Sequence, residues 1–412
     1  MKKSILIIFL LSIAISCKQK TESKSNESKD YTILNDSLNL ELNTIYKQKS
    51  IVGFSVAVVN DKGTIYDKGF GYSDLEKQEK YSSETTQKIA SIAKTLIAVS
   101  LLKAQELGKL NIDDPINKYL PFKVVNPNHP ENQITIRHLA THTSTIGDID
   151  AFFLNSYVID TIGNSKNAIP YDYFIKADSK MPLIDFIKNL IEENGKWYSS
   201  EVFSKNIPGE KFQYSNTAST LCALIIQIAT DEPYEQFARK YILKPLKMSS
   251  SRWSNERNTG KSDSRHYIDN ERVTVNYSTN SYPENGFITS SSDLAKYLSE
   301  LINGYSGKGT ILNKENYNEL FKKQLSQEQI GKERNGTLGI FFEHTNGFMG
   351  DSTISIGHNG SDPGTLTAMY FNPKTLIGKI VLTNTDFDFD ESVMPEFKEI
   401  WAELGKYEKR LN

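Results

Sequence analysis

The alternation of apolar and polar positions predicts strands at both ends of the chain. Residues 52–59 and 64–70 are two apolar runs joined by Asn-Asp-Lys-Gly, a favourable turn sequence for a β-hairpin. Residues 366–371 and 378–383 form a second pair of predicted strands, joined by Asn-Pro-Lys-Thr. The simplest closure of these four strands is one antiparallel sheet built from both ends of the chain.

Helical periodicity dominates the middle of the chain. The pattern predicts helices over residues 91–107, 182–193, 217–230, 234–243, 292–303 and 392–405, and Gly108 ends the first of them. The predicted fold class is therefore α+β, with an antiparallel sheet flanked by helices and an inserted all-helical lobe. The sheet lobe takes about residues 31–115 and 280–412, and the helical lobe about residues 116–279. Residues 155–173 and 255–281 are polar and predicted to be irregular loops, of a length that often borders an active site.

The first residues have the layout of an export signal. Met-Lys-Lys-Ser precedes an apolar run over residues 5–15, which is shorter than the roughly 20 residues that a membrane-spanning helix needs. Residues 1–16 are therefore predicted to be a signal peptide. Ala-Ile-Ser-Cys at residues 14–17 resembles a bacterial lipobox, which implies lipidation of Cys17 and anchoring of an exported protein in the cell envelope. The polar residues 18–30 are predicted to be a flexible tether, so that the globular part begins near Tyr31.

Charge and cysteine content narrow the classes of partner. The 48 Lys and Arg residues nearly balance the 50 Asp and Glu residues, and the absence of a basic stripe argues against nucleic acid as a partner. The expected membrane contact is the lipid on Cys17. If Cys17 is lipidated, Cys222 has no partner for an intramolecular disulfide. The apolar neighbours of Cys222 predict a buried, inert thiol.

Ser-Ile-Ala-Lys at residues 91–94 is the first candidate for chemistry. Residues three apart share a helix face, so the amine of Lys94 can lie beside the hydroxyl of Ser91. A serine becomes a good nucleophile only when a neighbouring base takes its proton. A lysine in apolar surroundings loses proton affinity and can serve as such a base. The motif alone is common by chance, so its weight depends on the rest of the chain.

Two further motifs follow in order, Tyr-Ser-Asn at residues 214–216 and His-Asn-Gly-Ser at residues 358–361. With residues 91–94 they resemble the penicillin-recognising serine hydrolases, and most of all the branch that contains class C β-lactamases, D-stereospecific peptidases and related esterases. Similar stretches lie at residues 107–121, 134–144, 208–248 and 285–295, and the resemblance covers about residues 40–385. It implies the same α+β fold, a site in the cleft between the lobes, and chemistry without a metal or organic cofactor.

The resemblance implies a role for each residue of the first two motifs. Ser91 would be the acylated nucleophile, placed at a helix N-terminus. Lys94 would position or deprotonate it. Tyr214 matches the tyrosine of the family's second motif, and a nearby ammonium would favour its phenolate, so it could act as a base near neutral pH. Which of Lys94 and Tyr214 takes the proton stays open, because coupled groups titrate together. Asn216 would hold a substrate carbonyl or orient Lys94.

The third motif departs from the family pattern. Where β-lactamases usually carry Lys-Thr-Gly, this chain has His358, Asn359 and Gly360. Histidine is mostly neutral at pH 7, so it suits a substrate carboxylate less well than lysine does. Gly360 would let a substrate approach the strand closely. The backbone N–H groups of Ser91 and Ser361 would form the oxyanion hole that the resemblance implies.

Two features of the predicted helical lobe bear on the candidate site less directly. His138 and His142 have the spacing of metal ligands on a helix, but no glutamate lies between them, so we expect no metal site there. Thr145 stands where the family usually has a glycine, which puts the geometry of that turn in question.

The predicted function is a serine hydrolase that forms an acyl-enzyme on an ester or amide. Its substrate would be a small ester, a peptide or a D-amino-acid peptide. A β-lactamase or DD-peptidase is the second interpretation, ranked lower because of His358. The third is an inactive cell-envelope binding protein. Thr145 favours it mildly, whereas the complete set of Ser91, Lys94, Tyr214 and His358 argues against it, because a binding protein needs none of this chemistry.

Overall fold

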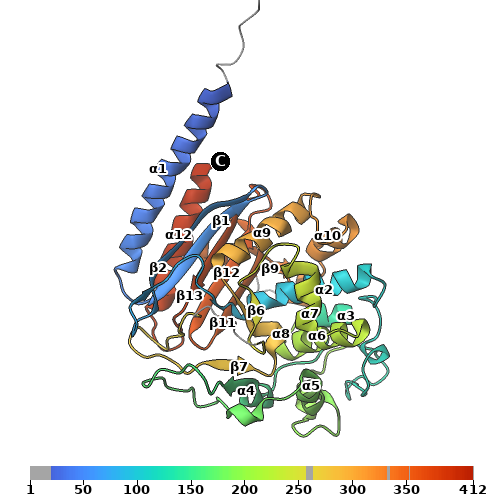
Figure 1. Ribbon diagram of the computed structural model, residues 1–412. Coiled ribbons are helices and arrows are strands. Elements are labelled where there is room, and N and C mark those ends of the chain that lie inside the picture. Colours follow the sequence, from blue (N-terminus) through green and yellow to red (C-terminus); the bar gives the residue numbers. More distant parts are fainter. Residues whose placement is uncertain (1–19, 257–262, 332–334, 352, 412) are drawn as a thin grey trace, which may run out of the picture.

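An eight-stranded antiparallel sheet forms the centre of the molecule in the computed structural model, which describes residues 20–256, 263–331, 335–351 and 353–411. The strand order is β3-β2-β1-β13-β12-β11-β10-β9 (Figure 1). These strands are β1 Gly53–Asn60, β2 Gly63–Asp74, β3 Glu79–Lys80, β9 Gly336–Leu338, β10 Glu343–Asn346, β11 Ile354–Asp362, β12 Thr365–Phe371 and β13 Gly378–Thr383. The pairing of β1 with β13 joins the two ends of the chain and confirms the predicted sheet.

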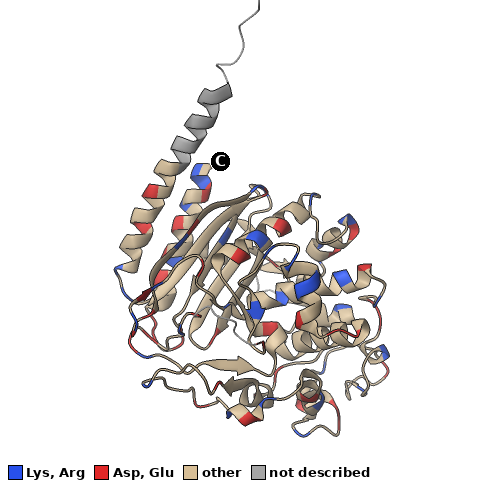
Figure 2. Cartoon of the chain, viewed as in Figure 1, with Lys and Arg blue, Asp and Glu red and all other residues tan. Residues whose placement is uncertain are grey.

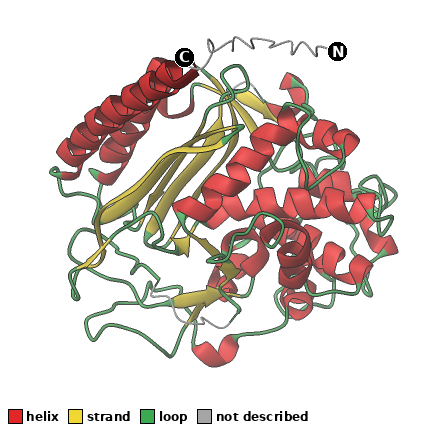
Figure 3. Cartoon of the chain, turned by 45° about the horizontal axis from the view of Figure 1, so that its top comes forward, coloured by secondary structure: helices red, strands yellow, loops and turns green. Residues whose placement is uncertain are grey.

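Both faces of this sheet are covered by helices. Val56 and Val58 of β1 pack toward one face, where helices α1 (Lys20–Tyr46) and α12 (Val393–Leu411) lie side by side (Figure 3). Ala57 and Val59 point to the other face and join the larger apolar core. Because successive strand residues alternate between faces, a strand buried on both sides must be continuously apolar, as this one is.

The helical lobe and α9 cover that second face. Helices α3 to α7 lie within the predicted helical lobe, and α2, α8, α9, α10 and α11 lie outside its bounds. These helices are α2 Ala93–Glu106, α3 Ile136–Ala140, α4 Asp150–Ser156, α5 Leu183–Ile191, α6 Asn216–Thr230, α7 Tyr234–Ala238, α8 Tyr282–Asn285, α9 Ser291–Tyr305, α10 Lys314–Phe321 and α11 Gln327–Ile330. The predicted helices are present, with ends that differ by a few residues. The predicted helix over residues 234–243 is split, because α7 passes into a π-helical turn at Arg239–Leu243.

The N-terminal helix differs from the prediction. Residues 20–30, which their polar composition predicted to be a flexible tether, are helical, because α1 extends back to Lys20. Leu38, Leu42 and Ile45 anchor the later part of α1 in the apolar layer against α12. An anchored helix extends at low cost through residues that include no Gly or Pro. The predicted signal peptide and Cys17 lie outside the described residues.

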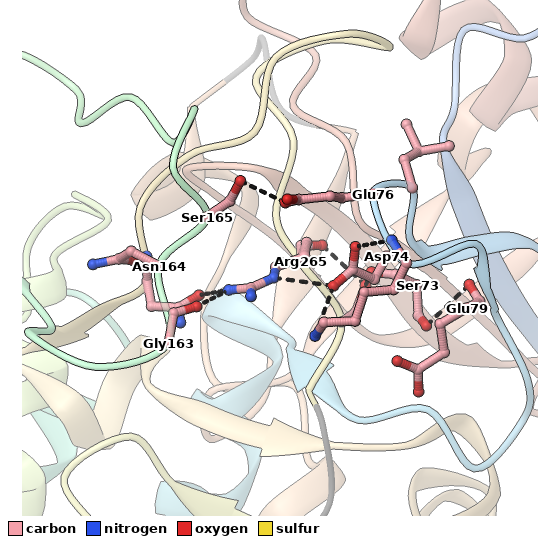
Figure 4. Close-up of polar contacts among 12 residues, drawn as sticks. Ser73, Asp74, Glu76, Glu79, Gly163, Asn164, Ser165 and Arg265 are labelled. Atoms are coloured by element: carbon pink, nitrogen blue, oxygen red, sulfur yellow. Dashed lines mark hydrogen bonds and ion pairs between the residues drawn. The ribbon is translucent and has the colours of Figure 1, made fainter.

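The loops at residues 155–173 and 255–281 are more ordered than predicted. They contribute β5 (Tyr157–Ile159) and β7 (Tyr277–Thr279), which pair as a two-stranded ladder. Arg265 fastens this region to the end of β2 (Figure 4). Its Nε lies 3.4 Å from Oδ2 of Asp74, while Nη1 donates to the backbone oxygen of Gly163. Ser165 adds a hydrogen bond of 2.7 Å to Glu76.

The surface carries charges of both signs. Figure 2 shows Lys and Arg interspersed with Asp and Glu over the visible helices, in keeping with the near-zero net charge. Among the described helices, none combines the length and the apolar character that crossing a membrane takes.

A buried glutamate joins α12 to the start of β1 and makes stability depend on pH. Oε2 of Glu396 accepts hydrogen bonds from the backbone N–H groups of Ser50 (2.9 Å) and Ile51 (3.2 Å). Burial raises the pKa of this carboxyl to about 7. The unfolded carboxyl titrates near pH ~4.3, so the folded protein holds the proton more tightly. The contribution of Glu396 to stability therefore falls as the pH rises from about 4.3 to about 7.

We expect Glu396→Gln to be more stable than the wild type at pH 8 by about 1–3 kcal/mol, and no more stable at pH 4. Glutamine keeps the accepting oxygen and removes the buried charge. Urea unfolding at the two pH values measures the difference. The matched control is Glu391→Gln, an exposed position just before the same helix that does not act on Glu396. An equal gain at both pH values would show that ionisation of Glu396 is not the cause.

Candidate active site

Ser91 lies in a short helical turn, η1 (Ala90–Ile92), directly before the buried helix α2. Ala90 has φ +49°, a left-handed conformation that costs a non-glycine residue about 1–2 kcal/mol. Such a cost is maintained only where the surrounding packing fixes the backbone, as happens at functional sites. The turn places Ser91 at the N-terminal end of the helix, as predicted.

Lys94 lies one turn later on the same face and is fully buried. Its Nζ donates a hydrogen bond of 2.8 Å to Oγ of Ser91, as the spacing predicted. Nζ also lies 2.5 Å from Oε2 of Glu284, which α8 brings to the site from 190 residues away. Glu284 is itself buried and accepts a second bond of 3.2 Å from the hydroxyl of Ser281. No pattern near residue 91 or residue 284 indicates this pair.

Glu284 changes the protonation expected for the lysine. Burial alone would lower the pKa of Lys94, as the sequence suggested, but the carboxylate of Glu284 outweighs burial and the pKa is raised. Burial raises the pKa of Tyr214, and Lys94 offsets only part of that rise. These directions favour an ammonium at Lys94 and a neutral phenol at Tyr214, beside the carboxyl of Glu284. Burial, and to a smaller extent Glu284, therefore oppose the phenolate that the sequence led us to expect at Tyr214.

Tyr214 reaches the site from the segment that leads into α6. Asp148 holds this helix start, accepting from the backbone N–H groups of Asn216 (2.9 Å) and Thr217 (2.8 Å). The ring centroid of Tyr214 lies 4.6 Å from that of His142 and 5.2 Å from Nζ of Lys94. The phenol is also within interaction range of Ser91. The second motif is thus brought against the first by the packing of α6 beside α2.

The third motif lies on β11 and passes close to the nucleophile. A Cβ added to Gly360 would stand 2.8 Å from the backbone nitrogen of Ser91 and 2.5 Å from the oxygen of Ile89. Only glycine permits this close approach of β11 to the turn that carries Ser91. His358 is buried, and its Nδ1 lies 2.5 Å from the carbonyl oxygen of Asn359. A carbonyl can only accept, so Nδ1 carries a hydrogen.

An open cavity of about 290 Å³ lies over Ser91. All the predicted site residues within the described part line it, except Lys94, which lies behind Ser91. The lining residues are Ser91, Phe153, Tyr157, Tyr214, Asn216, Glu284, Glu343, His358, Asn359, Gly360, Ser361 and Asp362. Sequence reasoning missed Phe153, Tyr157, Glu284, Glu343 and Asp362. Of these only Asp362 had a local signal, since it follows Gly360 by two residues on a strand and so shares its face.

The two histidines with metal-like spacing accept hydrogen bonds from backbone N–H groups. Nδ1 of His138 accepts from the N–H of Thr135, and Nδ1 of His142 accepts from the N–H of Ser215, each at 3.2 Å. Thr145 adopts φ +69°, so the turn keeps the conformation that a glycine would favour. Cys222 is buried in α6, and burial raises the pKa of its thiol.

The close approach of β11 predicts a sharp effect for Gly360→Ala. Both atoms nearest the added methyl belong to the backbone, so the strand must move away from Ser91. We expect kcat/KM to fall about 100-fold or more, the loss seen when one oxyanion-hole donor is removed. Steady-state hydrolysis of a p-nitrophenyl ester measures it. Gly405→Ala, in α12, adds a methyl that meets only side-chain atoms at 3.7 Å or more and should leave the position of Ser91 unchanged. Equal rates for Gly360→Ala and the wild type would contradict the assignment.

Comparison with known proteins places this geometry in a family. The family model described as Beta-lactamase matches residues 38–399. Protein flp of Staphylococcus aureus (strain MRSA252) is 26% identical over 344 residues, which are 82% of this chain and 60% of that protein. The putative penicillin-binding protein PbpX of Bacillus subtilis (strain 168) is 28% identical over 233 residues, 56% of this chain and 48% of the relative. The chain thus spans well under two thirds of these relatives' length.

Solved structures share the fold. The octameric penicillin-binding protein homologue from Pyrococcus abyssi aligns with TM-score 0.65 and 26% identity, over 85% of this chain and 73% of its own. The D-amino acid amidase from Ochrobactrum anthropi SV3, complexed with D-phenylalanine, aligns with TM-score 0.65 and 18% identity. The alignment covers 90% of this chain and 99% of the amidase chain. With most of its length matched by the family model, this chain belongs to the beta-lactamase family of serine hydrolases.

Proposed function

We propose that this protein is a serine hydrolase that forms an acyl-enzyme at Ser91 on an ester or amide substrate. One observation carries the proposal: Oγ of Ser91 faces an open cavity and lies 2.8 Å from Nζ of Lys94. The family resemblance implies that the backbone N–H groups of Ser91 and Ser361 serve as the oxyanion donors. A hydroxyl, a proton carrier and an oxyanion site are the parts that acyl transfer needs.

The Lys94–Glu284 pair supports a route for the serine proton. The ammonium of Lys94 donates to Ser91 and so cannot accept from it. Transfer of one proton across the 2.5 Å contact to Glu284 leaves a neutral amine. Burial raises the pKa of Glu284, which favours this transfer, whereas the raised pKa of Lys94 opposes it, so the neutral amine is the less populated state. The amine then takes the proton of Ser91 as Oγ attacks the substrate carbonyl.

Tyr214 is placed to complete acyl transfer. Its phenol gives a proton to the leaving nitrogen or oxygen, and Lys94 returns a proton to the phenolate. The bond from carbonyl carbon to leaving group breaks, and the acyl group stays on Ser91. Water then attacks the acyl-enzyme, with the same groups acting in reverse. Asn216 lines the cavity and makes no hydrogen bond to Lys94 within the described residues, which favours substrate contact over orientation of the lysine.

The cavity favours a small ester, an amide or a peptide over a β-lactam. No Lys or Arg is among the described residues that line it, and His358 stands at the position of the family's usual lysine. A β-lactam or a D-alanyl peptide presents a carboxylate, which would find no permanent cation there. The likeness to a D-amino acid amidase is one of fold, and it agrees with amide hydrolysis. Export and anchoring through Cys17 stay predictions, which fatty-acid labelling of Cys17→Ala against the wild type would test.

The test is intact-mass spectrometry after reaction with a fluorophosphonate probe, followed by turnover of a p-nitrophenyl ester, nitrocefin and a D-alanyl peptide. We expect one adduct, on Ser91, and turnover of the ester. Nitrocefin hydrolysis as the dominant activity would favour the β-lactamase alternative. Absence of both adduct and turnover would overturn the proposal and favour a binding protein that keeps the fold.

A further inference from the structure

Asp362 is a buried acid in the cavity wall that acyl transfer does not use. It ends β11, is 8% exposed, and accepts a hydrogen bond of 2.8 Å from the hydroxyl of Tyr157 through Oδ1. Its other oxygen, Oδ2, is buried and has no hydrogen-bond partner among the described residues. Buried polar atoms are nearly always paired, because an unpaired one loses its hydration without compensation. The free oxygen is therefore a position that a ligand donor can occupy.

The charges around Asp362 favour a cation. Lys94, the nearest cation on the Ser91 side, is bound to Glu284 at 2.5 Å. Lys88 also acts on the charge of Asp362, but its Nζ donates to the backbone oxygen of Tyr277 and lies 3.0 Å from the centroid of the Tyr277 ring. The remaining acid of the lining is Glu343, which accepts from Tyr370 at 2.6 Å. The cavity thus has acidic groups in excess of the cations that face it.

The strand fixes how far Asp362 is from the reacting atoms. Gly360 touches the turn of Ser91, and Asp362 follows on the same face two residues later, about 7 Å along the strand. An amino group on the carbon next to the scissile carbonyl lies two bonds from the carbonyl carbon, about 2.5 Å. A hydrogen bond of about 2.8 Å from that amino group to a carboxylate would span most of the remaining distance to Asp362. The spacing therefore suits an amine close to the scissile bond.

We propose that Asp362 binds the ammonium group of the substrate, so that the site selects esters and amides of acids with a free amino group beside the scissile carbonyl. This inference rests on the proposed hydrolase function and names its substrate class. Burial raises the pKa of the Asp362 carboxyl to about 7, so its charge is poorly stabilised in the empty site. An ammonium placed against it would supply the missing stabilisation. N-acylation of the substrate would remove that cation, and a substrate carboxylate would be repelled.

Binding to the Ser91→Ala variant tests this without requiring turnover. Titration calorimetry compares phenylalaninamide, in both enantiomers, with its N-acetyl and des-amino counterparts. We expect the better enantiomer with a free amine to bind about 30-fold more tightly or better, as for other desolvated charge pairs. Asp362→Asn keeps an acceptor for Tyr157 and should abolish that preference. In the enzyme with Ser91 intact, kcat/KM for the matching p-nitroanilides should show the same pattern.

A matched control is Asp386→Asn. Asp386 is also a buried aspartate that accepts a tyrosine hydroxyl, from Tyr171 at 2.5 Å, but it does not line the cavity. It should keep the preference for the free amine. Equal binding of free and acetylated amides, or no binding of either, would overturn the inference while labelling of Ser91 leaves the hydrolase proposal standing. Equal loss of both ligands in Asp362→Asn would assign the residue to holding Tyr157. Failure of Ser91 to react with the probe would instead overturn the hydrolase proposal.

Discussion

Ser91→Ala is expected to lose turnover by about 10⁴-fold or more while the fold survives. The nucleophile supplies the covalent step, and removing it from other serine hydrolases costs rate factors of this size or larger. The substitution removes one hydroxyl from a partly exposed position, so the packing of α2 changes little. The hydroxyl also accepts the 2.8 Å hydrogen bond from Lys94, but Glu284 continues to hold the ammonium. The measurements are kcat/KM on a p-nitrophenyl ester, the fluorophosphonate adduct and the melting temperature.

The control for this prediction is Ser100→Ala, a buried serine farther along α2. It removes the same group from the same helix, outside the cavity, and should keep both the adduct and the turnover. Retained hydrolysis in Ser91→Ala, or an adduct on another residue, would contradict the acyl-enzyme mechanism. Loss of activity in Ser91→Ala together with a large fall in melting temperature would show that the substitution disturbs folding. An adduct that persists in Ser100→Ala would show that the probe reacts specifically with Ser91.

Glu284→Gln is expected to lower the free energy of unfolding by about 3–5 kcal/mol at pH 7. Lys94 and Glu284 are both almost completely excluded from solvent, with side-chain exposures of 0% and 3%. Removing one member of such a pair leaves the other charge buried without compensation, which costs about this much. Chemical denaturation with two independent probes measures the change and checks that unfolding stays cooperative.

The double variant Lys94→Met/Glu284→Gln separates lost charge balance from lost packing. Methionine is uncharged and similar in length to lysine, so no uncompensated charge remains, and most of the lost stability should return. A cost below about 1 kcal/mol for Glu284→Gln alone would mean that the pair is not held as the geometry shows. If the double variant were less stable than Glu284→Gln, packing rather than charge would account for the loss.

The sequence by itself determined the fold class and indicated Ser91 and the three motifs as the candidate site. Apolar periodicity is set by which face of each element is buried, and local patterns such as residues 91–94 depend only on helix geometry. The hairpin of β1 and β2, helix α2 ending before Gly108, and the closure of β1 on β13 all follow from such local rules. Composition misjudged residues 20–30, because a helix anchored by Leu42 and its neighbours extends through residues that would not form one alone.

Only the tertiary structure decided the electrostatics of the site. Glu284 meets Lys94 across 190 residues of chain, and this contact reverses the expected fall in the lysine pKa. Asp362 acquires its buried, half-paired carboxylate because Tyr157, from a loop predicted to be irregular, packs against it. Charges act through space and through the burial that surrounds them, neither of which periodicity or spacing records. The residues of the reaction can therefore be named from sequence, whereas their protonation, and with it the substrate charge that the cavity favours, depends on the folded arrangement.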